Sequence, residues 1–95
     1  MKRVYKYPIE ICEEVKVMMP KGARVLSVQV QNGMPCLWAA VDSNEMDLEE
    51  RLFHIVGTGL PIQHDVEDDS VDGFIGTIQL LDGRIVIHVF EMKRL

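Results

Sequence analysis

The triplet Gly57-Thr58-Gly59 is the first stretch of the sequence that could bind a ligand. Small residues allow backbone N–H groups to approach an anion closely, and consecutive N–H groups can form an anion-binding nest. The triplet lacks the lysine of a P-loop, is not G-x-G-x-x-G, and precedes no clear helix. The alternative interpretation is a bulge or turn at the end of a strand, held by Pro61, and the spacing alone favours this alternative.

His88 is the second candidate, because a two-residue turn at Asp82-Gly83 would place it opposite Thr77. A histidine beside a hydroxyl can act as a general base or bind an anion. It can equally be a histidine whose hydrogen bonds are satisfied within an interface. His54 alternates with apolar neighbours, and we expect it to be a partly exposed strand residue.

The acids that follow His64 suggest a metal site only at first sight. Their spacing does not match the EF-hand loop, which needs acids at alternate positions and a central glycine. A solvated acidic loop is the better interpretation. We therefore predict no metal site.

No nucleophile, acid and base occur together in a known enzyme signature. Cys12 and Cys36 are the only cysteines, and no C-x-x-C motif is present. We expect two free, buried thiols in a reducing cytosol. We assign no catalytic residue and no cofactor, and we lean against an enzyme, although a small hydrolase using Cys36 or His88 stays open.

Strand-like alternation dominates the elements that must position these residues. Nothing longer than one helical turn is expected, and that turn would lie within Asp42–Glu50 with Ser43 as its cap. The predicted strands are Val4–Ile9, Glu14–Met18, Arg24–Gln31, Met34–Val41, Arg51–Val56, Phe74–Leu81 and Arg84–Glu91.

Asn32-Gly33 and Asp82-Gly83 each predict a tight hairpin, because both dipeptides tolerate the positive φ angles of a two-residue type I′ turn. Such turns fix the pairing of the flanking strands. The first turn pairs Ser27 with Trp38, Val25 with Ala40 and Leu26 with Ala39, and the second pairs Ile75 with Phe90.

Each hairpin then has one apolar face, expected in the core, and one mixed face. The mixed faces suit a subunit interface or a wet pocket, where tryptophan offers an apolar body with one polar atom. The predicted core comprises Leu26, Val28, Val30, Leu37, Ile78, Leu80, Ile85 and Ile87. The mixed faces hold Ser27, Gln29, Cys36, Trp38, Thr77, Gln79 and His88.

The chain has 95 residues, which predicts a single domain spanning 1–95, and its margin of stability is thin enough to favour self-association. It is 47% hydrophobic, with a net charge of −5 and ten scattered basic residues. Duplex nucleic acids and anionic membranes are therefore poor partners. No signal-peptide or membrane-spanning pattern is evident, so we expect a complete, cytoplasmic chain.

The predicted fold class is all-β, with six or seven mostly antiparallel strands in a small sandwich or partly open barrel.

The segments "VQVQNGMPCLWAAVD", "GTGLPI" and "IGTIQLLDGRIVIHVFE" resemble a family of short proteins of unknown function from tailed phages and prophages. The Tyr5–Pro8 start and the Pro20–Ala23 turn also match, so the resemblance covers nearly the whole chain. Leu60 stands where the family has a loop histidine, which puts the role of that loop in doubt. Small phage proteins often act on the host, and one class forms oligomers that sequester nucleotide-derived immune signals. The extension of that role to this chain rests on an analogy of size and source.

Two hypotheses follow. In the first, the chain is a non-catalytic homo-oligomer in the host cytoplasm that sequesters a small nucleotide-like ligand where mixed faces and loops of two subunits meet. Trp38 would stack a base, which contributes roughly 1–3 kcal/mol. In the second, the chain is a protein-interaction or structural phage protein without a ligand, and Trp38 and His88 fill an interface. The expected ligand-binding residues are Trp38, Gly57, Thr58, Gly59, His88, Thr77, Arg84 and Arg24.

Overall fold

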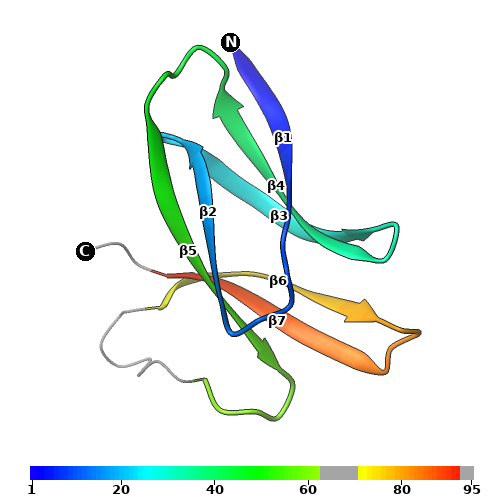
Figure 1. The fold of residues 1–95 in the computed structure, drawn as a ribbon. Coiled ribbons are helices and arrows are strands. Elements are labelled where there is room, and N and C mark those ends of the chain that lie inside the picture. Colours follow the sequence, from blue (N-terminus) through cyan, green and yellow to red (C-terminus); the bar gives the residue numbers. More distant parts are fainter. Residues whose placement is uncertain (63–70, 93–95) are drawn as a thin grey trace.

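Seven antiparallel strands form two sheets, as the alternation of apolar and polar residues predicts (Figure 1). The computed structural model describes residues 1–62 and 71–92. One sheet has the order β1-β4-β3 and the other the order β2-β5-β7-β6, and neither closes into a barrel. The strands are β1 (Lys2–Pro8), β2 (Glu14–Pro20), β3 (Arg24–Gln31), β4 (Met34–Asp42), β5 (Leu48–Gly57), β6 (Val71–Leu80) and β7 (Ile85–Met92).

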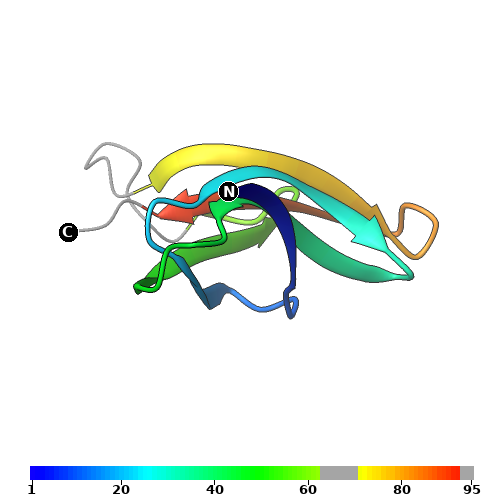
Figure 2. The same cartoon turned by 90° about the horizontal axis from the view of Figure 1, so that it is seen from above.

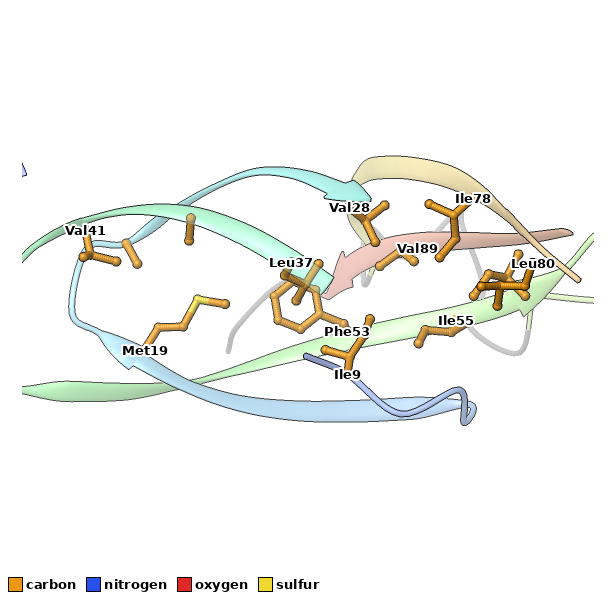
Figure 3. Packing of buried hydrophobic residues seen from close by; sticks show 13 residues of the cluster. Ile9, Met19, Val28, Leu37, Val41, Phe53, Ile55, Ile78, Leu80 and Val89 are labelled. Carbon is orange, nitrogen blue, oxygen red and sulfur yellow. The ribbon is translucent and has the colours of Figure 1, made fainter. Parts of the chain in front are cut away.

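The two sheets bury one cluster of apolar side chains between them. Figure 3 shows Leu37 of β4 beside the ring of Phe53 of β5, and both side chains are fully buried. The molecule measures 41 × 35 × 16 Å and is thin when seen from above (Figure 2). This thickness suits a sandwich whose two packed sheets lie about 10 Å apart.

The first hairpin forms as predicted. Asn32 and Gly33 have φ angles of 52° and 77°, the two positive values that a type I′ turn requires. Gln31 consequently pairs with Met34, and Ser27 pairs with Trp38. The side chain of Trp38 therefore lies on the side of the sheet opposite to Leu37, away from the core.

The second hairpin has the predicted register but a longer turn. Leu80 pairs with Ile85 and Thr77 with His88, as expected. The chain reverses through Leu81–Arg84 instead of Asp82-Gly83 alone, and Arg84 N–H donates to the carbonyl of Leu81. Leu81 and Asp82 both have left-handed φ angles, of 52° and 55°, so the reversal begins one residue early.

Three predicted core residues are in fact substantially exposed. A bulge between Val25 and Ser27 shifts the pairing, so that Val25 lies opposite Ala39 and Leu26 loses its partner. Leu26 is 49% exposed as a result. Val30 and Ile85 lie at the hairpin ends of their strands, at the margin of the core, and are 38% and 37% exposed.

Bulges also interrupt β6, on either side of Phe74. Phe74 instead of Ile75 lies opposite Phe90, which corrects the predicted pair. Gly76 follows the second bulge, at the place where β6 approaches β3 of the other sheet. A Cβ atom on Gly76 would lie 2.9 Å from Cγ1 of Val28, so glycine is required here by the close approach.

The helical turn expected within Asp42–Glu50 is absent. Asp42 Oδ1 accepts the backbone N–H of Asn44, and the hydroxyl of Ser43 bonds the carbonyl of Met1. These hydrogen bonds stabilise a turn between β4 and β5 instead of capping a helix.

We predict that Gly76→Ala lowers the free energy of unfolding by about 1–3 kcal/mol, because the new methyl group overpacks the contact with Val28. Urea denaturation measures the change. In the double variant with Val28→Ala the added methyl group has room, so the combined cost should be smaller than the sum of the two single costs. Strict additivity of the two costs would contradict the close approach.

Candidate functional site

His88 is held between two threonine hydroxyls on the outer side of the four-stranded sheet. Nδ1 of His88 lies 2.8 Å from Oγ1 of Thr77, its partner across the β6–β7 ladder. Nε2 lies 2.7 Å from Oγ1 of Thr58, which belongs to the loop after β5. The structure therefore brings together three of the predicted ligand-binding residues from three separate segments.

The Gly57–Gly59 loop closes as a turn. The N–H of Thr58 donates to the carbonyl of Val86, and the N–H of Leu60 donates to the carbonyl of Gly57. These two groups are consequently already used within the chain. The consecutive N–H groups of an anion nest are not available here, and the loop offers a ligand the Thr58 side chain instead.

A cleft of about 730 Å³ opens beside this loop. Three segments line it: the β1–β2 connection, the end of β5 with its following loop, and the start of β7. Most of the lining is apolar, and its charged side chains among the described residues are Glu13 and Arg84. Thr58 belongs both to this lining and to the hydrogen-bonded group around His88. The lining includes Ile11, Cys12, Glu13, His54, Val56, Gly57, Thr58, Leu60, Pro61, Arg84, Ile85 and Val86.

His54 also lines the cleft, and its predicted partial exposure is wrong. The side chain is 1% exposed. Its Nδ1 donates to the carbonyl of Glu13 at 3.0 Å, and the same carbonyl accepts the backbone N–H of Ile55. The β1–β2 connection thus packs against this side of β5, which an isolated strand pattern does not reveal.

Trp38 and Arg24 lie elsewhere, on the outer side of the three-stranded sheet. Lys6 of β1 lies opposite Trp38, with its Nζ 6.0 Å from the centre of the ring, near the limit of a cation–π contact. Nε1 of Trp38 is buried and has no hydrogen-bond partner in the part of the chain that the structure describes. Within one chain, the cleft beside Gly57–Gly59 does not include Trp38, so a site holding both requires a second subunit.

The family of the chain follows from a comparison of the whole sequence. Residues 1–95 match a domain of unknown function, DUF7352. The chain belongs to the DUF7352 family. No curated protein and no solved structure matches it.

A buried ionic group in this DUF7352 chain was missed by the sequence analysis. Arg51 is 6% exposed and lies on the inner side of β5. Its Nε and Nη2 atoms donate to both carboxylate oxygens of Glu91, and Nη1 donates to the carbonyl of Ala23 and to Glu49. The hydrogen bonds to Glu91 raise the pKa of Arg51, while burial acts in the opposite direction. The sequence did carry one signal for it. Arg51 lies two positions before Phe53, so an inward-facing Phe53 places the arginine on the same inner face of the strand.

The remaining candidates do not assemble into a reactive centre. Cys12 and Cys36 are both free thiols, but Cys12 is exposed, against expectation. Cys36 lies in the three-stranded sheet opposite Gln29, on a different sheet from His88. No group of three or more metal-ligating side chains occurs in residues 1–62 and 71–92, and no helix there could cross a membrane. His64 lies outside the described residues.

We predict that Arg51→Met destabilises the chain by about 3–5 kcal/mol, because it removes a buried cation and leaves the largely covered carboxylates of Glu91 and Glu49 without it. Thermal or urea denaturation measures the loss. The matched control is Lys16→Met, which breaks the exposed pair with Glu50 and should cost less than about 1 kcal/mol. Equal costs for the two variants would show that Arg51 does not act as a buried ion-pair partner.

Proposed function

We propose that this chain is a non-catalytic binding protein whose cleft takes up a small nucleotide-like ligand. The cleft itself carries the proposal. Its volume of about 730 Å³ lies within the range of small-molecule sites, which are mostly apolar and contain a few polar groups. A cleft of this kind can hold the flat, apolar part of a ligand and one charged group at once.

The chemistry of the lining favours an anion with an apolar body. Ile11 and Leu60, from two different segments, expose apolar surface beside the cleft. Arg84 supplies a cation and Thr58 a hydroxyl, so a phosphate group could accept hydrogen bonds from both. This combination suits a base or sugar attached to a phosphate.

Binding without turnover is supported by the surroundings of His88. A histidine 2.7 Å from a hydroxyl has the spacing of a base and its nucleophile. In such sites a carboxylate usually holds the second ring nitrogen and stabilises the imidazolium ion. Here the second nitrogen meets the uncharged hydroxyl of Thr77, and no carboxylate contacts the ring among the described residues.

The biological setting that we propose comes from the resemblance to short phage proteins. In this proposal the chain acts in the host cytoplasm as a homo-oligomer and sequesters a nucleotide-derived immune signal. Stoichiometric capture requires affinity and abundance but no reaction.

We predict that cyclic dinucleotides or ADP-ribose derivatives raise the Tm of the chain. A ligand at about 100 times its Kd adds about 2.7 kcal/mol, or roughly 10 °C or more for a domain of this size. Arg84→Ala should weaken binding by about 10-fold or more, because a hydrogen bond to a charged group contributes about 1.5–3 kcal/mol. A thermal-shift screen followed by calorimetry measures both effects.

The matched control is Arg3→Ala, which removes an exposed arginine from β1 of the other sheet. Its affinity for the same nucleotide should equal that of the wild type. The proposal fails if no nucleotide stabilises the protein, or if the two arginine variants bind equally.

A second candidate function is interaction with another protein, and Phe74 favours it. This side chain is 57% exposed on the outer side of the edge strand β6. Its ring packs at a tilt of 59° against Phe90, with the ring centres 5.5 Å apart. An exposed aromatic pair of this kind is typical of interface cores.

We predict that Phe74→Ser reduces self-association, because it removes the aromatic surface that a second copy would cover. Light scattering across a concentration series measures the change. Leu81→Ser, in the exposed β6–β7 turn, is the control and should leave the oligomeric state unaltered. Unchanged assembly of Phe74→Ser would rule out this surface as the self-interface.

A further inference from the structure

Thr77, His88 and Thr58 form a continuous chain of hydrogen-bonding groups that ends in the cleft. His88 lies on β7, Thr77 opposite it on β6, and Thr58 in the loop after β5. The two hydroxyl oxygens lie 2.8 and 2.7 Å from the two ring nitrogens. Both nitrogens of the imidazole are therefore engaged, and only Thr58 among these residues also lines the cleft.

The proton on His88 determines what the Thr58 hydroxyl can do. A hydroxyl has one hydrogen and two lone pairs. When Nε2 carries a proton, it donates to Oγ1 of Thr58, and the hydroxyl hydrogen of Thr58 can point to another acceptor. When Nε2 is bare, Thr58 donates its only hydrogen to the ring and has none for a ligand. Thr77 can satisfy Nδ1 in either state, since its hydroxyl can donate or accept.

We propose that an oxyanion in the cleft binds together with a proton on Nε2 of His88, which makes Thr58 a hydrogen-bond donor toward the ligand. This inference rests on the proposed ligand-binding function and specifies its chemistry. The shared feature of the ligands is an oxygen that accepts a hydrogen bond and carries negative charge, as in a phosphate. Arg84 contributes charge, and His88 acts as the positioning residue that sets the direction of the Thr58 hydroxyl.

The His88 ring is the group in contact with the Thr58 hydroxyl that can gain or lose a proton on the contacting atom. On the outer face, Val56 of β5 and Thr77 of β6 lie opposite it and carry no charge. His54 lines the same cleft, but its Nδ1 donates to the carbonyl of Glu13. The charged side chains of the lining, within residues 1–62 and 71–92, are Glu13 and Arg84.

The test uses sulfate as the probe, because sulfate is an oxyanion that does not titrate between pH 5 and 9. NMR of the assigned ring nitrogens of His88 reports the protonation of Nε2, with chloride at equal ionic strength as the reference. In the wild type, sulfate should raise the ratio of rings that carry a proton on Nε2 to rings that do not, by about tenfold over chloride.

Two variants at one position separate this coupling from a structural role of the loop. Thr58→Val keeps the shape but removes the hydroxyl, so sulfate should no longer change the His88 ring. Thr58→Ser restores the hydroxyl and should restore the response. The proposal is overturned if sulfate leaves the wild-type ring unchanged, or if Thr58→Val responds as the wild type does. Nucleotide binding that persists without any response of His88 would reject this coupling alone, whereas failure of every nucleotide would reject the binding function.

Discussion

The burial of one face of each sheet against the other is the constraint on which the rest of the structure depends. A chain of 95 residues has little apolar surface, so both sheets must contribute their inner faces to one core. Leu37 and Phe53 meet there without exposure to solvent. Because side chains alternate along a strand, their neighbours Trp38 and His54 must point outward. The candidate site is built from such outward residues and from the loops at the strand ends.

The polar groups that are nevertheless buried show how strictly this constraint is met. Arg51 points inward and is accommodated because Glu91 engages it with both carboxylate oxygens. His54 points outward but is covered, and the carbonyl of Glu13 satisfies its Nδ1. His88 and Thr58 reach solvent and are instead paired with one another, and the Thr58 hydroxyl in this pair can donate or accept. The buried ion pair is fixed in direction, whereas the hydrogen bond at the surface can reverse. This arrangement is expected of a stable scaffold that carries a binding site on its surface.

The sequence was sufficient for the features that depend on neighbouring residues, and insufficient for those that depend on packing. Alternation and the dipeptides Asn32-Gly33 and Asp82-Gly83 predicted the strands, most of the register and the outward direction of Trp38 and His88. The bulge at Leu26 could not be predicted, because the alternating pattern of Arg24–Gln31 runs on without a sign of it. Neither could the pair Arg51–Glu91, since the two residues lie 40 positions apart. The cleft was hidden for the same reason, because its three segments meet only in the folded chain.

The interrupted edges of the two sheets have a consequence for how the protein behaves when crowded. Bulges break the ladders of β3 and β6, and Lys2, Arg3 and Lys6 place positive charge along β1. At β3 and β6 an added strand from another molecule would meet an irregular row of donors and acceptors, and at β1 a basic strand would be repelled. Edge-to-edge growth of the sheets is therefore disfavoured at these three edges, and β2 is the remaining edge, which keeps a regular ladder.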